Sequence, residues 1–313
     1  MSPMSQPGPE MGIGYQSPVY AAALGMATRV QALPACGGHL LLRAIAGSDQ
    51  HDACGAYPVF SCRTPARLVD DIEALGQSLV SVTLVADPLL DWDRAMLERS
   101  FEVVRPLGAH YVIDIGKPDF CPSPHHGRAL RRAAAHDIEF RIDACPVGFT
   151  PAWTRLYQML VEHAGITGLR RFSEAIFGRM LAVPGTVVVT AWERDELLGA
   201  DWYFEDGERI YAHLSAYSKA GYARAASYPM MDAALRHFAG RGARLMDLGG
   251  VPVVGGGGRG LARFKEGWST RTLPSWLCGR RLNPSAYDEL RRQTGTLDTD
   301  YFPAYRRGEY GRT

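Results

Sequence analysis

The residues with the clearest chemical potential lie at the end of one glycine-rich stretch. Of the 34 basic residues only Lys117, Lys219 and Lys265 are lysine. Lys265 follows a run of glycines and lies between Phe264 and Trp268. An ammonium group on a flexible stem can pair with a phosphate or a developing oxyanion, and its pKa shifts readily on burial. We therefore expect Lys265 to act in catalysis, the alternative being an ordinary surface charge.

Two groups that can transfer protons and one carboxylate occur in the preceding segments. His213 and Tyr217 would share one face of a strand over residues 209–217, because side chains alternate along a regular strand. Asp247 ends a further expected strand beside two glycines, where its carboxylate could orient an amine or pair with Lys265. The structural alternatives are a histidine in solvent or in a satisfied core, and a carboxylate bonded to loop amides.

The second half of the chain predicts the elements that must position these residues. They are strands over 186–192, 197–204 and 209–217, a helix over 227–239 and a strand over 244–248. The first three strands follow one another closely, which predicts an antiparallel meander. Residues 251–260 are rich in glycine and predict a loop, either a lid over the site or a simple surface loop.

The first half alternates strands and helices in the same way. The expected strands are 39–45, 79–85, 110–115 and 139–144, and the expected helices are 66–78, 92–104, 127–136, 151–163 and 172–181. This alternation predicts a mixed α/β (α+β) fold class.

The length and composition indicate a globular chain with two domains. A chain of 313 residues is long for one hydrophobic core, and 46% hydrophobic with 21% charged residues is ordinary for such proteins. Residues 1–18 are rich in Pro, Gly and Ser and predict a disordered lead without the pattern of a signal peptide. We expect the domains to span residues 19–150 and 151–313.

The six cysteines are scattered without a CxxC pair or matching histidine spacing, which argues against a zinc site and a disulfide framework. We expect no metal, no membrane span, and reduced thiols in a cytoplasmic protein. The charge is uneven, with a net −4 over residues 1–113 and a net +5 over residues 259–313. A basic C-terminal quarter would suit a phosphate-bearing partner such as coenzyme A, a nucleotide-linked precursor or tRNA. A solvated arginine face is the alternative.

Four of these segments together resemble a known family. They are the strand around Tyr211–Ala216, the helix over 227–239, the strand end Asp247-Leu248-Gly249-Gly250, and the run from Gly260 through Phe264-Lys265 to Trp268. The order is similar to that in the C-terminal half of FemAB-like members of the GNAT acyltransferase superfamily. The likeness is clear over residues 186–290, weaker over 123–185, and rests on topology alone over 20–122.

The resemblance implies tandem GNAT-like domains, each a mixed, mostly antiparallel sheet flanked by helices, the C-terminal one being catalytic. It also implies transfer of an acyl or aminoacyl group to an amine of a small molecule, peptide or precursor, with no bound cofactor. The donor is aminoacyl-tRNA in FemAB-like enzymes and acyl-coenzyme A, such as acetyl-CoA, in other GNAT relatives. A non-catalytic GNAT-fold binding or scaffold protein is the competing function.

Acyl transfer needs a neutral amine, a donor to the carbonyl oxyanion and a proton for the leaving group. The resemblance implies that Lys265 lies near the reacting carbonyl. His213 would then take the amine proton, Tyr217 would return one to the leaving group, and Asp247 would orient the amine or the lysine. The usual coenzyme A pyrophosphate loop is represented only by a degenerate segment over 219–226, which favours aminoacyl-tRNA as the donor.

Two sets of residues are candidates for substrate binding. Backbone amides and a helix N-terminus after residue 220 would form the arrangement that binds phosphates. The donor-binding candidates are Lys219, Gly221, Arg224, Ser227 and Phe264. The acceptor-binding candidates are basic residues at places where family members meet the acceptor, and aromatic residues that could line a pocket or belong to the core: His125, His126, Arg128, Arg131, Trp202 and Trp268.

Overall fold

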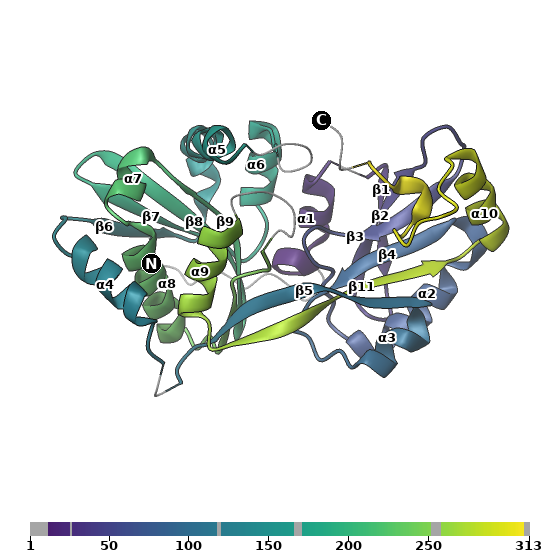
Figure 1. Ribbon diagram of the computed structural model, residues 1–313, viewed down its shortest axis with the longest axis horizontal. Helices are drawn as coiled ribbons and strands as arrows, with labels where there is room; N and C mark the ends of the chain where they lie inside the picture. Colours follow the sequence, from purple (N-terminus) through teal and green to yellow (C-terminus); the bar gives the residue numbers. More distant parts are fainter. Residues whose placement is uncertain (1–11, 26, 118–119, 166–170, 252–257, 310–313) are drawn as a thin grey trace. The chain divides into compact units, whose positions relative to one another are not determined.

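A computed structural model describes residues 12–25, 27–117, 120–165, 171–251 and 258–309 of the chain (Figure 1). The chain forms two compact units, one of residues 1–107 and 274–313 and the other of residues 108–273. This division differs from the boundary expected after residue 150. Two long strands, β5 (Val103–Asp114) and β11 (Arg271–Arg281), each begin in one unit and end in the other. A boundary that cuts through two strands leaves no composition change in the sequence.

The first unit is a mixed sheet with helices. Its strands are β1 (Arg29–Leu33), β2 (Gly38–Ala44), β3 (His51–Gly55), β4 (Ser81–Ala86) and most of β11, and its helices are α1 (Pro18–Ala23), α2 (Leu68–Ala74), α3 (Arg94–Ser100) and α10 (Pro284–Gln293). The strand order is β1-β2-β3-β4-β11. The pairs are antiparallel except for β3 and β4, which run parallel.

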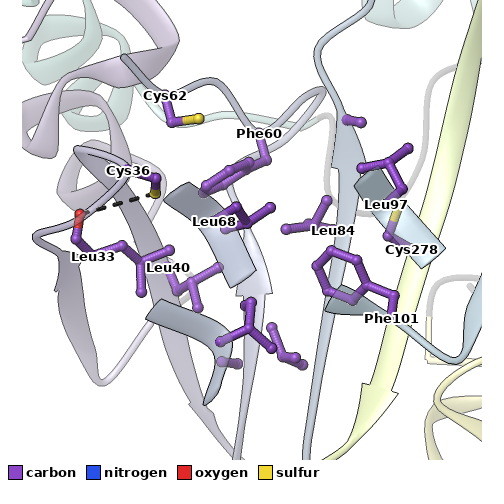
Figure 2. Packing of buried hydrophobic residues seen from close by; sticks show 14 of the residues in the cluster. Leu33, Cys36, Leu40, Phe60, Cys62, Leu68, Leu84, Leu97, Phe101 and Cys278 are labelled. Carbon is purple, nitrogen blue, oxygen red and sulfur yellow. Dashed lines mark hydrogen bonds between the residues drawn. The ribbon is translucent and has the colours of Figure 1, made fainter. Parts of the chain in front are cut away.

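One face of this sheet packs against α2 and α3. Figure 2 shows the core between them, in which Leu40 and Leu84 of the sheet meet Leu68 of α2 and Leu97 of α3. Asp93 precedes the α3 helix and caps it, because its carboxylate accepts a hydrogen bond from the Met96 amide at 2.6 Å. Such a cap satisfies an amide that has no partner inside the helix.

The second unit repeats this plan around a longer sheet. Its strands are β6 (Glu139–Asp143), β7 (Thr186–Glu193), β8 (Glu196–Asp206), β9 (Arg209–Tyr217), β10 (Leu245–Asp247) and the end of β5. Its helices are α4 (Pro124–Ala133), α5 (Thr150–Ala164), α6 (Glu174–Leu181), α7 (Lys219–Ala223), α8 (Ser227–Gly240) and α9 (Gly258–Trp268). The strand order is β5-β10-β9-β8-β7-β6, and only β9 and β10 pair in parallel.

Helices cover both faces of the second sheet. On one face Trp153 of α5 meets Trp202 of β8, with ring centroids 5.4 Å apart. On the other face Phe238 of α8 meets Tyr203 of β8 at 5.2 Å. Successive residues of β8 therefore point into two different cores, as the alternation of a strand requires. The predicted class, a mixed, mostly antiparallel α/β fold flanked by helices, is confirmed.

Several local predictions need correction. The helix expected over 92–104 ends at Ser100, and the residues from Val103 onward belong to β5. Residues Gly14–Gln16 form a turn of 3-10 helix and α1 begins at Pro18, so regular structure starts inside the expected disordered lead. The loop expected over 251–260 already becomes helical at Gly258. Its remaining part, over 252–257, lies outside the described residues.

No helix in the described ranges is long and apolar enough to cross a membrane.

The C-terminal segment is fastened to β3 by a buried ion pair. Arg306 donates through Nε and Nη2 to the carboxylate of Asp52 at 2.6 and 2.8 Å, and Tyr305 donates its hydroxyl to the same carboxylate. The Asp52 side chain is only 3% exposed and that of Arg306 10%. The pair is therefore largely shielded from water, unlike most ion pairs among the described residues.

We predict that Arg306→Ala lowers the free energy of unfolding by about 3 kcal/mol or more, because it leaves a buried carboxylate without its cation. The exposed pair of Arg292 with Glu289 provides the control, and Arg292→Ala should cost at most about 1 kcal/mol. Chemical denaturation of both variants measures the difference. Equal losses would show that the Arg306 pair does not anchor the C-terminal segment.

Candidate functional site

The second sheet opens where β9 and β10 separate. The two strands pair only between Arg209–Tyr211 and Leu245–Asp247, whereas β9 continues to Tyr217. Among the described strands, nothing pairs with this edge of β9 beyond Tyr211. The backbone amides of that edge can therefore receive a ligand, and Asp247 lies at the point where the strands part.

A carboxylate and a histidine meet at this point. His110 of β5 and Asp247 of β10 are 9% and 4% exposed, and the His110 Nδ1 to Asp247 Oδ2 distance is 2.7 Å. The other carboxylate oxygen, Oδ1, accepts a hydrogen bond from the Gly249 amide at 2.7 Å. Both oxygens of Asp247 are thus held, and the carboxylate has a fixed orientation.

Lys265 lies next to the two glycines that follow β10, Gly249 and Gly250. Its Nζ donates to the Gly250 carbonyl at 2.7 Å, and the side chain is half-buried on α9. Burial lowers the pKa of Lys265 to about 8, against the opposing attraction of Asp247. Gly249 has φ +75°, and a Cβ there would lie 3.4 Å from the lysine Nζ. A glycine at 249 therefore avoids backbone strain and leaves room beside the ammonium group.

The α9 helix that carries Lys265 is held by His126. The buried His126 ring lies within hydrogen-bond distance of Ser123 Oγ through Nδ1, at 2.7 Å, and of the Phe264 carbonyl through Nε2, at 2.9 Å. A Cβ at Gly267 would lie 2.0 Å from the ring, so the ring occupies the space that this glycine leaves. His126 was expected to bind the acceptor, but burial and two occupied nitrogens make it a support for α9 instead.

Phe264 and Trp268 belong to the same support. The Phe264 ring packs 5.3 Å from Tyr228 of α8 and 5.6 Å from His126 of α4. Trp268 is 1% exposed and stacks with Phe120. These positions differ from the expected donor and acceptor contacts, because the aromatic rings fill the space between α4, α8 and α9.

The two residues expected to transfer protons on one face of β9, His213 and Tyr217, lie on opposite faces of the sheet. A bulge at Trp202/Tyr203 leaves His213 outside the ladder, since Trp202 pairs with Leu214 and Tyr203 with Ala212. The His213 ring lies against Trp202 and Phe204 on the α5 face, and burial lowers its pKa to about 3. Because the expected shared face assumed a regular strand, the bulge is the physical reason for the difference. Trp202 is fully buried there rather than in an acceptor pocket.

Tyr217 lies on the α8 face, in a buried polar cluster. Its hydroxyl donates to Asp201 Oδ1 at 2.6 Å, and the Tyr203 hydroxyl donates to Oδ2 at 3.2 Å. Burial raises the pKa of Asp201 to about 6, although these hydroxyls oppose the shift. Burial also raises the pKa of Tyr217 well above its ordinary value. The hydroxyl proton of Tyr217 is thus held in the hydrogen bond to Asp201.

The expected phosphate-binding turn is a short helix packed against β8. A Cβ at Gly221 would lie 2.0 Å from the Leu198 carbonyl oxygen, and the Gly221 amide donates to Ser218 Oγ. Arg224 pairs with Glu193 at 2.6 Å. Gly221 is therefore required for close packing of α7. Neither its amide nor the Arg224 guanidinium points into an open phosphate-binding site. Lys219 is exposed, and Ser227 begins α8.

The remaining acceptor candidates lie on α4. His125, Arg128 and Arg131 are all exposed, and the two arginines line a shallow open pocket beside Ser123. The basic residues of the C-terminal quarter are largely engaged with neighbouring groups. Arg281 pairs with Glu102, and Arg280 donates to the Ser100 carbonyl. Among the described residues, no group of three or more His, Cys, Asp or Glu could hold a metal ion.

A known protein family is similar to one part of the chain. Residues 125–266 match the family described as acetyltransferase (GNAT) domain. This segment runs from α4 to α9 and contains both Asp247 and Lys265. This part of the chain is therefore similar to a GNAT acetyltransferase domain, and His110 lies before the matched segment.

Solved structures extend the likeness over most of the chain. FemX is 11% identical with a TM-score of 0.63, covering 80% of this chain and 86% of FemX. The C-terminal domain of a putative lysylphosphatidylglycerol synthetase from Agrobacterium fabrum is 12% identical with a TM-score of 0.60, covering 87% and 92%. L-PGS from Bacillus licheniformis is 14% identical with a TM-score of 0.54, covering 89% and 97%.

At such low identity these structures share the fold alone. Together with the family match they confirm a resemblance in fold to FemAB-like members of the GNAT superfamily. No curated protein matches the chain in sequence.

The Asp201 cluster predicts a pH-dependent stability. Because the folded protein raises the pKa of Asp201 from 3.8 to about 6, it binds more protons than the unfolded chain between these values. Stability should therefore fall as pH rises from about 4 to about 6, by up to about 3 kcal/mol. Asp201→Asn should remove this fall in denaturation experiments at pH 4 and 7, whereas Asp195→Asn at the exposed β7–β8 turn should keep it. An unchanged pH dependence in Asp201→Asn would contradict the assignment.

The His126 support predicts a contrast between two glycines of α9. Gly267→Ala should destabilise the protein by about 1–3 kcal/mol, because the added Cβ collides with a buried ring. Gly260→Ala meets no atom within 4 Å and should be neutral or slightly stabilising, since alanine favours helix. Thermal unfolding compares them. If Gly267→Ala unfolds like Gly260→Ala, the ring does not fix α9.

Proposed function

We propose that this protein is an N-acyltransferase that moves an acyl or aminoacyl group from an activated donor to an amine. The observation that carries the proposal is Lys265 beside Asp247 at the parting of β9 and β10, within a GNAT domain. A cation of lowered pKa, held near an unpaired strand edge, is the arrangement that stabilises a carbonyl oxyanion. A scaffold protein would have no need of a half-buried lysine there.

In the proposed reaction the donor carbonyl binds along the open edge of β9, with its oxygen toward the Lys265 ammonium. The neutral acceptor amine attacks the carbonyl carbon and forms a C–N bond. The bond from carbon to the ester oxygen or thioester sulfur then breaks. The nitrogen loses one proton and the leaving group gains one, so the products are an amide and a free hydroxyl or thiol.

We propose an aminoacyl ester, as in aminoacyl-tRNA, as the donor in preference to acyl-coenzyme A. Two contacts support this choice, namely the Gly221 amide bonded to Ser218 and Arg224 bonded to Glu193. Both groups would be needed for a pyrophosphate cradle, and both are already engaged. Lys219 and Ser227 remain the candidates for contact with the donor, and no bound cofactor is required.

We propose that the acceptor amine approaches from α4, which presents His125, Arg128 and Arg131 to solvent. Two exposed arginines beside an open pocket suit an anionic acceptor such as a phosphate-bearing precursor.

The proposal is tested by mass spectrometry of the purified protein with aminoacyl-tRNA or acyl-coenzyme A, each offered a panel of amines. We expect an N-acyl product from the aminoacyl ester, and a rate about 100-fold lower in Lys265→Ala. Lys117→Ala removes a surface lysine that pairs with Asp114 and should keep the wild-type rate. A product from acyl-coenzyme A alone would reverse the choice of donor. No product from either donor would favour the scaffold alternative.

The lowered pKa of Lys265 predicts a basic limb in the pH–rate profile. The rate should fall as pH rises through about 8, because the ammonium group that stabilises the oxyanion loses its proton. Lys265→Arg should be slower but should retain activity to higher pH, since a guanidinium stays charged. A wild-type rate that stays flat or rises through pH 9, or a basic limb unmoved in Lys265→Arg, would exclude the lysine as its source.

A further inference from the structure

We propose that His110 is the general base of this site and that its Nε2 takes the proton of the acceptor amine. The inference rests on the proposed N-acyl transfer and adds a catalytic residue to it. His110 lies outside the segment that matches the GNAT family, because that segment begins at residue 125.

The Asp247 carboxylate determines which nitrogen of His110 is the base. An ionised carboxylate only accepts hydrogen bonds, so the 2.7 Å contact requires the proton on Nδ1. The neutral ring then carries its lone pair on Nε2. No described residue forms a hydrogen bond with Nε2, which leaves it available to a ligand. The same carboxylate would stabilise the imidazolium that forms when Nε2 accepts a proton.

The two glycines after β10 bring His110 and Lys265 to one place. A Cβ at Gly250 would lie 3.4 Å from His110 Cδ2 and 3.6 Å from Nε2. The carbonyl of the same glycine accepts the Lys265 Nζ hydrogen bond, and a Cβ at Gly249 would lie 3.4 Å from that Nζ. The base and the cation thus approach the same two-residue segment, which has no side chains to separate them.

The other candidates for this role are engaged elsewhere. His213 is packed between rings on the α5 face, where its lowered pKa of about 3 makes it a poor base. The Tyr217 hydroxyl donates to Asp201, and His126 supports α9. Among the described residues of this unit, His110 is the histidine that both lies against Gly250 and has a nitrogen open to a ligand.

The step conserves protons. His110 Nε2 accepts one proton from the acceptor nitrogen as the C–N bond forms, and the imidazolium returns that proton to the leaving oxygen or sulfur as its bond to carbon breaks. Lys265 keeps its proton and neutralises the oxyanion between these events.

The test compares the wild type with His110→Asn, in which the Asn amide can still donate to Asp247 but no base remains. We expect kcat to fall about 100-fold or more and the donor KM to stay within about twofold. His163→Asn, an exposed histidine on α5, is the control and should match the wild type. Thermal unfolding confirms that both variants fold.

Two results distinguish a failure of this inference from a failure of the proposed function. A wild type that forms N-acyl product, together with His110→Asn at an unchanged rate, would overturn the base alone. A wild type that forms no N-acyl product would overturn both. Nitrogen-15 NMR of the wild-type histidines gives a readout without turnover: we expect the neutral His110 to be protonated on Nδ1, and protonation on Nε2 instead would overturn the inference.

Discussion

The buried hydrogen bond between Asp247 and His110 is the constraint on which the site depends. A carboxylate that is 4% exposed is stable only when its oxygens are bonded, and here one meets the histidine and the other the Gly249 amide. These bonds join β10 to β5 and fix the backbone turn after β10. Lys265 is then held against the Gly250 carbonyl, close enough for electrostatic attraction to the Asp247 carboxylate. One interaction therefore positions an anion, a potential base and a cation of lowered pKa.

Many of the surrounding side chains support Asp247, His110 and Lys265 instead of contacting substrate. The His126 ring holds the α9 helix by filling the space left at Gly267, and Phe264 and Trp268 pack beside the ring. Gly221 serves the packing of α7 on β8 in the same way. Rigid support of this kind is what a catalytic cation requires, because small displacements of a reacting group are costly to rate.

The sequence predicted what local patterns determine. The meander β7 to β9, the α8 helix, and the placement of Asp247 and Lys265 near one another all follow from hydrophobic periodicity, glycines and a family motif. His110 was missed because its partner lies 137 residues away, and only the pairing of β5 with β10 brings them together. The bulge in β9 was also invisible, and it moved His213 to the face opposite Tyr217. Long-range pairing and local irregularity are the two features that residue patterns do not encode.

The most direct test of the account is a double-mutant cycle on the rate of N-acyl product formation, with Asp247→Asn, Lys265→Met and the double variant. Residues that act as one unit have non-additive effects. If Asp247 and Lys265 form a single centre, the double variant should be faster than the two separate losses multiplied together, by a coupling of about 1 kcal/mol or more. Losses that simply multiply would show that the carboxylate and the lysine act independently, and would contradict the account.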